Sequence, residues 1–111
     1  MLQVPAGFYD DSDAPLDEDL VHSEEHGYVI IWYDCEKLPS AVTCPQLEQG
    51  IKEVMNDLGG VKLIALPRKG MPTMLALTSW TKLQRLDAFD VDRITNFYKT
   101  HFEESPEPDG Y

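Results

Sequence analysis

The segment Tyr28–Tyr33 (YVIIWY) decides the fold, because it is the most apolar run in this chain of 111 residues. Its residues are β-branched or aromatic, and polar and apolar side chains do not alternate along it. This pattern is typical of a central strand that is covered on both faces. We therefore predict a buried strand here, followed by a loop over residues 34–43.

Three helices are expected around this strand, because apolar residues recur at helical spacing and capping residues stand at their ends. Gly27 is placed to cap the end of the short first helix, whereas Thr43 and Asp90 are placed to cap the starts of the other two. The expected ranges are residues 15–27, 44–60 and 90–102.

Three further strands are expected after the longest helix. They cover residues 61–66, 73–80 and 82–89, and the last reads as a short edge strand. Together these elements predict an α+β domain, with a small, mainly antiparallel sheet of three to four strands packed with two main helices and one short N-terminal helix. A crossover through the helix 44–60 would make the first two strands parallel neighbours.

The charge of the chain is unevenly distributed. Residues 1–25 contain eight acidic residues and no Lys or Arg, and the net charge of the whole chain is −11. This balance argues against nucleic acid as a partner, and no segment is apolar enough for a membrane span. We divide the chain into an acidic N-terminal arm (1–16), one domain (17–104) and a polar tail (105–111). The arm is either a solvated segment or a site for a cation or a basic protein partner.

The sequence HSEEH places His22 and His26 four residues apart. On a helix this spacing lets two imidazoles bind one metal ion, and Glu25 adds a carboxylate. Imidazole with thioether or thiolate favours copper or zinc, whereas imidazole with carboxylate suits zinc or nickel. Candidate further ligands are His101, Cys35, Cys44, Met71, Met74 and the acidic arm. The alternative is structural: one histidine caps a carbonyl at the helix end and the other is solvated.

The same five residues match the pattern H-x-x-E-H of inverted zinc peptidases, with Glu25 as general base. The pattern is short, and peptidases that use it have far larger catalytic domains. Ser23 is adjacent to His22, but neighbouring helix residues diverge, so no nucleophile–base pair is expected.

The two cysteines, Cys35 and Cys44, flank the loop after the first strand. They either close a disulfide, which would contribute about 2–3 kcal/mol, or stay reduced, as is usual in the cytosol. They do not form the CxxC motif of thioredoxin-type redox proteins. Trp32 and Trp80 are expected to pack in the core or under the arm, each with an indole N–H that needs an acceptor.

The segments LVHSEEHGYVIIWYD and ALTSWTKLQRLDAFDVDRITNFY, with PEP near the end, resemble the bacterial family called domain of unknown function 3105. Its members are similar in an LVH-x-x-EHG segment before an apolar strand and an ALT-x-W segment before a short strand. On that pattern His22, Glu25, His26 and Gly27 occupy the first motif. Thr78 and Trp80 occupy the second, and the resemblance covers about residues 6–108.

Members of that family often carry a membrane anchor and a His/Pro-rich segment before this part, and the present sequence shows neither. The resemblance implies no established activity. With no signal or anchor, the sequence predicts a cytoplasmic protein, or an extracytoplasmic one if the chain is a truncated member.

These observations lead to a ranked set of functions. The first is a small non-enzymatic domain that binds copper or zinc through His22, His26 and Glu25. The second is a protein-interaction module that uses the acidic arm, and the third is a small zinc hydrolase.

Overall fold

The computed structural model describes residues 4–15 and 17–102. Its strands form one sheet in the order β1-β3-β2-β4-β5. In chain order the elements are β1 (Gly7–Phe8), α1 (Asp17–Glu25), β2 (Val29–Tyr33), α2 (Cys44–Asp57), β3 (Leu63–Pro67), β4 (Leu75–Ser79), β5 (Lys82–Leu86) and α3 (Val91–His101).

The strand directions in the sheet are mixed. β3 pairs parallel with both β1 and β2, whereas β4 pairs antiparallel with both β2 and β5. The prediction of an α+β domain with three helices is confirmed, and so is the parallel pairing of β2 with β3. The prediction of a mainly antiparallel sheet of three to four strands was wrong, since the described residues form a mixed sheet of five strands.

β1 accounts for this difference, because it adds a fifth strand and a second parallel pairing to the sheet of the described residues. β1 has only two residues, one of them a glycine, so it lacks the alternating or apolar pattern by which a strand is recognised. It lies in the stretch that the sequence assigned to the acidic arm, and Tyr9 N–H donates to the carbonyl of Ala65 at 2.8 Å. α2 carries the chain back along the sheet so that β3 starts at the same end as β2, as the sequence predicted.

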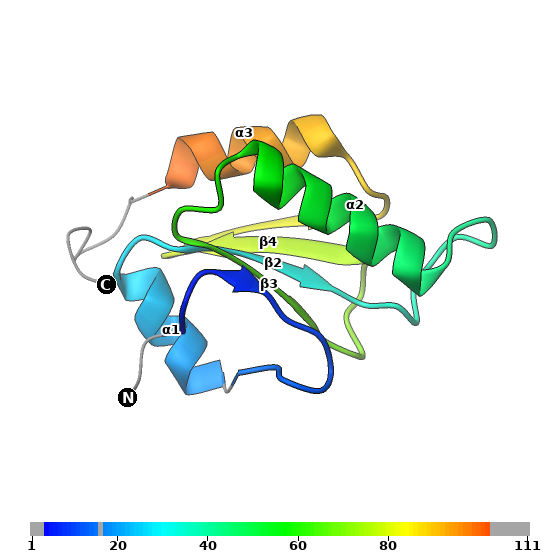
Figure 1. The fold of residues 1–111 in the computed structure, drawn as a ribbon, viewed down its shortest axis with the longest axis horizontal. Helices are drawn as coiled ribbons and strands as arrows, with labels where there is room; N and C mark the ends of the chain where they lie inside the picture. The colour runs from blue at the N-terminus through cyan, green and yellow to red at the C-terminus, as the bar shows by residue number, and fades with distance from the viewer. Residues whose placement is uncertain (1–3, 16, 103–111) are drawn as a thin grey trace.

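The three helices divide between the two faces of the sheet (Figure 1). α2 and α3 cover one face, where Ile31, Leu63 and Leu77 are fully buried against Ile51 of α2 and Ile94 of α3. Burial of each such side chain contributes about 1.5–3 kcal/mol. α1 lies against the other face, which has a smaller apolar cluster. Its buried members are Val4, Leu20, Tyr28, Ile30, Ile64 and Leu66.

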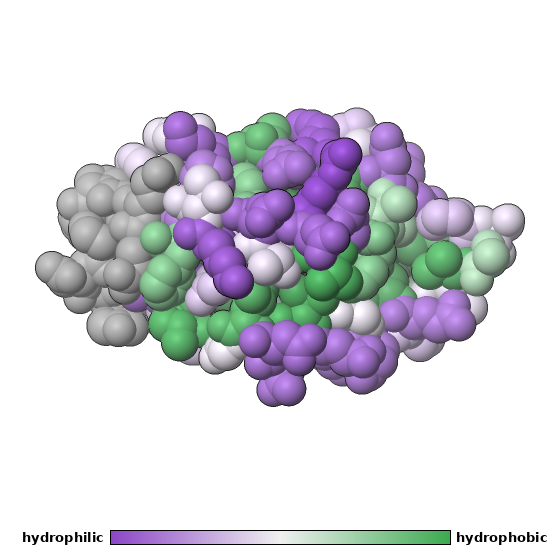
Figure 2. All heavy atoms as spheres, turned by 90° about the horizontal axis from the view of Figure 1, so that it is seen from above, coloured by the Kyte–Doolittle hydropathy of each residue, from purple (hydrophilic) through white to green (hydrophobic). Residues whose placement is uncertain are grey.

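The predicted caps of the two main helices are present. Thr43 and Gln46 form a reciprocal capping box at the start of α2, and the Asp90 carboxylate accepts from the N–H of Arg93 at 3.1 Å at the start of α3. Seen from the side of α2 and α3, the surface is mainly hydrophilic, with hydrophobic side chains visible between the polar ones (Figure 2). Within residues 4–15 and 17–102, no helix has the length and apolar character needed to span a bilayer.

Candidate functional site

The end of α1 positions the two histidines. The N–H groups of Gly27 and Tyr28 donate to the carbonyls of Glu24 and Ser23, at 3.0 and 3.2 Å, and Gly27 has a φ of 89°. This is a Schellman motif with glycine at the left-handed position, as the sequence predicted. The buried Lys62 ammonium donates to the carbonyl of His26 at 3.0 Å. The backbone of this turn is therefore held from both sides of the helix end.

The three predicted site residues lie together on this turn. The imidazole rings of His22 and His26 have their centroids 4.7 Å apart and are perpendicular, in edge-to-face contact. Nδ1 of His22 lies 3.8 Å from a carboxylate oxygen of Glu25. The side chains of His22 and Glu25 are about one-third exposed, at 29% and 32%. The segment thus presents two imidazoles and one carboxylate to solvent from a single helical turn.

The further ligands considered in the sequence do not join this turn. Cys35 and Cys44 are bonded to each other, and His101 lies on α3, on the opposite face of the sheet, with its ring 4.6 Å from that of Phe97. Met71 and Met74 are buried. Among the residues that the structure describes, no group of three or more His, Cys, Asp or Glu side chains is arranged to hold a metal ion.

Glu24, which the sequence reasoning missed, turns inward from α1 to the sheet. Burial raises the pKa of its carboxyl from 4.5 to about 7, although the Thr78 hydroxyl donates to it and partly offsets this effect. The same hydroxyl accepts from the indole N–H of Trp32 at 2.7 Å. Oε2 of Glu24 is buried and, within the described part of the chain, has no hydrogen-bond partner. The sequence did contain an indication of this inward position, because Glu24 lies one helical turn after the buried Leu20 and therefore on the same face of α1.

A family model matches almost the whole chain. The model described as "Protein of unknown function (DUF3105)" matches residues 2–110. The chain belongs to this family. No curated protein and no solved structure matches the chain.

The two segments that carry the resemblance to DUF3105 meet in space. Residues 20–27 form the C-terminal part of α1 and its cap, and residues 76–80 form most of β4 and the residue after it. The hydrogen bond from Thr78 to Glu24 joins them directly. In this DUF3105 protein the two sequence motifs therefore build one polar contact beneath the histidine turn.

Ser23 has a structural role in this DUF3105 chain. Its side chain is fully buried, and its hydroxyl accepts from the N–H of Val4 at 3.0 Å. It fastens the N-terminal segment to α1 and points away from His22, as the divergence of neighbouring helix residues predicted.

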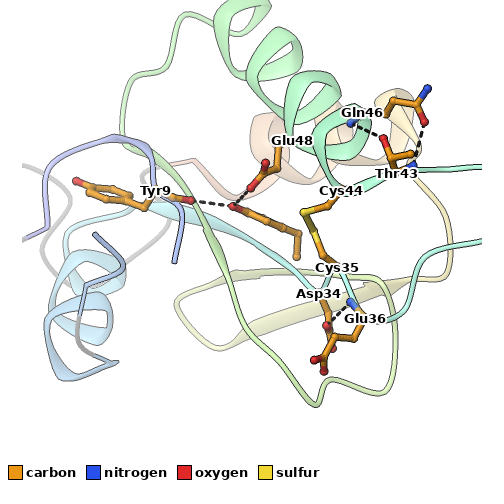
Figure 3. Close-up of a disulfide and its surroundings, with 9 residues drawn as sticks. Tyr9, Asp34, Cys35, Glu36, Thr43, Cys44, Gln46 and Glu48 are labelled. Carbon is orange, nitrogen blue, oxygen red and sulfur yellow. Dashed lines mark hydrogen bonds between the residues drawn. A yellow bond between two sulfur atoms is a disulfide. The ribbon is translucent and has the colours of Figure 1, made fainter. Parts of the chain in front are cut away.

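A second group of reactive side chains lies at the carboxyl end of β2. Cys35 and Cys44 form a disulfide with an S–S distance of 2.06 Å, which decides between the two states left open by the sequence (Figure 3). Nearby, the Tyr33 hydroxyl lies 2.9 Å from both the Glu48 carboxylate and the carbonyl of Tyr9. Burial and the adjacent Glu48 carboxylate raise the pKa of Tyr33 well above its usual range, so this phenol stays protonated.

Proposed function

We propose that this DUF3105 chain binds a transition metal ion, copper or zinc, through the imidazoles of His22 and His26, with Glu25 as an oxygen ligand. The single observation that supports the proposal is the contact of the two rings, 4.7 Å apart on one helical turn. Rotation of the rings about their side-chain bonds would direct one nitrogen of each to a shared point outside the helix.

The chemistry of the ligands favours Cu²⁺ over Zn²⁺. Imidazole suits both ions, and affinity for a given set of nitrogen and oxygen ligands increases to copper and then decreases at zinc. The net charge of −11 attracts cations to the surface in general, so it supports binding without selecting the ion. Three protein ligands would leave the remaining coordination positions to water or to a group from a partner.

Metal binding at this site should depend on pH. An imidazole binds a metal ion only in its neutral form, so the affinity should be lower in acidic solution. The hydrolase interpretation of H-x-x-E-H would also need a reacting water on the metal and stays a prediction.

Isothermal titration of Cu²⁺ and Zn²⁺ into untagged protein tests the proposal. We expect saturable binding to wild type, loss of that binding in the double variant His22→Ala/His26→Ala, and weaker binding in Glu25→Gln. His101→Ala is the matched control, because it removes an imidazole from a helix on the other face. Equal heats for wild type and the double variant would remove the metal site.

A second candidate function, docking of a basic protein on the acidic arm, is favoured by one observation. Part of the arm has an ordered turn, in which Asp10 accepts hydrogen bonds from the N–H and hydroxyl of Ser12, and these bonds lower the pKa of Asp10. Its carboxylate therefore stays charged. Binding of an oligolysine peptide that weakens with salt and with Asp10→Asn/Asp13→Asn, but survives the double histidine substitution, would support this candidate.

A further inference from the structure

The disulfide occupies a distinctive position in the sheet. Cys35 comes two residues after the end of β2, and Cys44 is the first residue of α2. The carboxyl ends of the parallel strands β1, β3 and β2 meet at this edge. In open sheets of this kind, ligands bind outside the carboxyl ends of the parallel strands.

Both sulfur-bearing residues can be reached from solvent. Cys35 and Cys44 are partly exposed and line a cavity of about 50 Å³. The cavity is also lined by charged side chains, those of Asp11, Asp34, Glu36, Glu48, Arg68 and Lys69. Exposed disulfides are the ones most open to reduction, whereas disulfides with a purely structural role resist it.

The two sulfurs differ in their surroundings. Cys44 stands at the amino end of a 14-residue helix, where the helix dipole stabilises an anion, so a thiolate is favoured at this position. Cys35 packs against the main apolar core instead. Glu48, one turn after Cys44, opposes the thiolate, but its carboxylate accepts a hydrogen bond from Tyr33 at 2.9 Å. Cys44 is therefore the sulfur suited to carry the mixed disulfide and to end as a thiolate, whereas Cys35 is the sulfur suited to take a proton.

We propose that Cys35–Cys44 is a redox-active disulfide that exchanges with the dithiol of a protein partner. A thiolate of the partner attacks Sγ of Cys44 and forms a mixed disulfide. The bond to Cys35 breaks, and Cys35 leaves with the electron pair and takes a proton from water. The second partner thiol loses its proton to water and attacks the partner sulfur of the mixed disulfide. Cys44 leaves as a thiolate.

The exchange balances in electrons and in protons. Two electrons pass from the partner dithiol to the cysteine pair, so the partner is oxidised to a disulfide while Cys35 and Cys44 are reduced. The acidic side chains around the cavity, Asp11, Glu36 and Glu48, outnumber Arg68 and Lys69. Since Asp34 adds a fourth carboxylate, the charge favours a partner with basic residues next to its thiols.

Single-cysteine variants test the asymmetry. Cys35→Ser leaves Cys44 free, and Cys44→Ser, its matched control, leaves Cys35 free. We expect Cys44 to ionise at a lower pH than Cys35, followed by thiolate absorbance at 240 nm. If the thiolate form of Cys44 is about tenfold more populated than that of Cys35 at pH 7, its rate rises by that factor, but a thiolate of lower pKa is also a weaker nucleophile. We therefore expect Cys44 to react with an aromatic disulfide at least about threefold faster than Cys35 at pH 7. Equal ionisation and equal rates would overturn the proposal.

The wild-type protein gives a test that does not depend on the variants folding. In buffers of reduced and oxidised glutathione, alkylation of free thiols should show a measurable equilibrium between the bonded and reduced cysteines. A disulfide that stays fully oxidised in excess reduced glutathione, in protein whose far-ultraviolet circular dichroism is native, would show a purely structural bond and overturn the proposal. Neither experiment involves the histidines, so each proposal can fail independently of the other.

Discussion

The carboxyl of Glu24 should make the stability of this protein depend on pH in a way that Glu24→Gln removes. Glu24 projects from α1 to the sheet, where burial raises its pKa to about 7. Glutamine has nearly the same shape, and its amide can keep a hydrogen bond to Thr78. The substitution therefore removes the titration while leaving the packing largely unchanged.

The direction of this pH dependence follows from the number of protons that the folded and unfolded states bind. Because the folded protein holds the Glu24 proton up to about pH 7 and the unfolded chain releases it near 4.5, the folded state binds more protons between these values. The free energy of unfolding of wild type must then decrease as the pH rises through this window. The stability associated with the protonated carboxyl is fully present below pH 4.5 and is lost above pH 7.

The size of the stability change follows from the two pKa values, 4.5 in the unfolded chain and about 7 in the folded protein. At about 1.36 kcal/mol per pH unit, the interval from 4.5 to about 7 corresponds to at most ~3 kcal/mol. The carboxyl is only partly buried, so solvent screening reduces this to about 1–3 kcal/mol. Glu24→Gln should therefore gain about 1–3 kcal/mol relative to wild type when the pH is raised from 5 to 8.

Urea unfolding at pH 5 and pH 8 measures this difference, followed by the fluorescence of Trp32 and Trp80 in buffer with a chelator. The other titratable groups are the same in both proteins, so their contributions to the pH dependence of stability cancel when the two are compared. Glu53→Gln is the control, because Glu53 is exposed on α2 and its removal should give no comparable gain. If Glu24→Gln follows the same pH dependence as wild type and Glu53→Gln, then the carboxyl is not desolvated and the reasoning fails.

Three further substitutions test local contacts, each by urea unfolding at pH 7. Ser23→Ala removes the acceptor of the Val4 N–H from a fully buried site and should cost about 1–3 kcal/mol; no loss would mean that Val4 is not held there. Gly27→Ala forces a side chain into a φ of 89° and should cost about 1–2 kcal/mol, unless the Schellman turn opens freely. Asp90→Ala removes the cap of α3 and should cost about 1 kcal/mol, whereas a neutral result would show the Arg93 N–H satisfied by water.

The sequence predicted those features that depend on a few neighbouring residues. The caps at Thr43 and Asp90 and the glycine turn at Gly27 were each visible in a short segment, and all three are present. The central position of β2 was also visible, because a strand without polar positions must be covered on both faces.

The sequence missed features that depend on distant segments. β1 is defined by its pairing with β3, more than fifty residues away, and not by its own composition. Val91 is apolar but is 47% exposed, because the first residue after the cap of α3 faces away from the sheet. Glu24 was overlooked because its environment comes from Thr78 on β4 and was not inferred from α1 alone.

The histidine turn and the disulfide lie at opposite ends of β2, whose five residues span about 17 Å at a rise of ~3.3 Å per residue. A chain of contacts along β2 runs between them, beside the ion pair of Arg68 with Asp17 of α1. The Thr78 hydroxyl donates to Glu24 and accepts from the Trp32 N–H, and the Arg68 guanidinium lies 4.6 Å from the centre of the Trp32 ring. Arg68 also lines the cavity beside Cys35.

The weakest contact in this chain limits the coupling between the two ends. Arg68 is 41% exposed, and a cation–π contact at an exposed site is worth about 0.5–1 kcal/mol. A double-mutant cycle of Glu24→Gln and Cys35→Ser, measured by urea unfolding at pH 8, should therefore give an interaction energy below about 1 kcal/mol. A larger value would mean that α1 and the loop after β3 have a second arrangement on this face of the sheet, and that the two ends of β2 change state together.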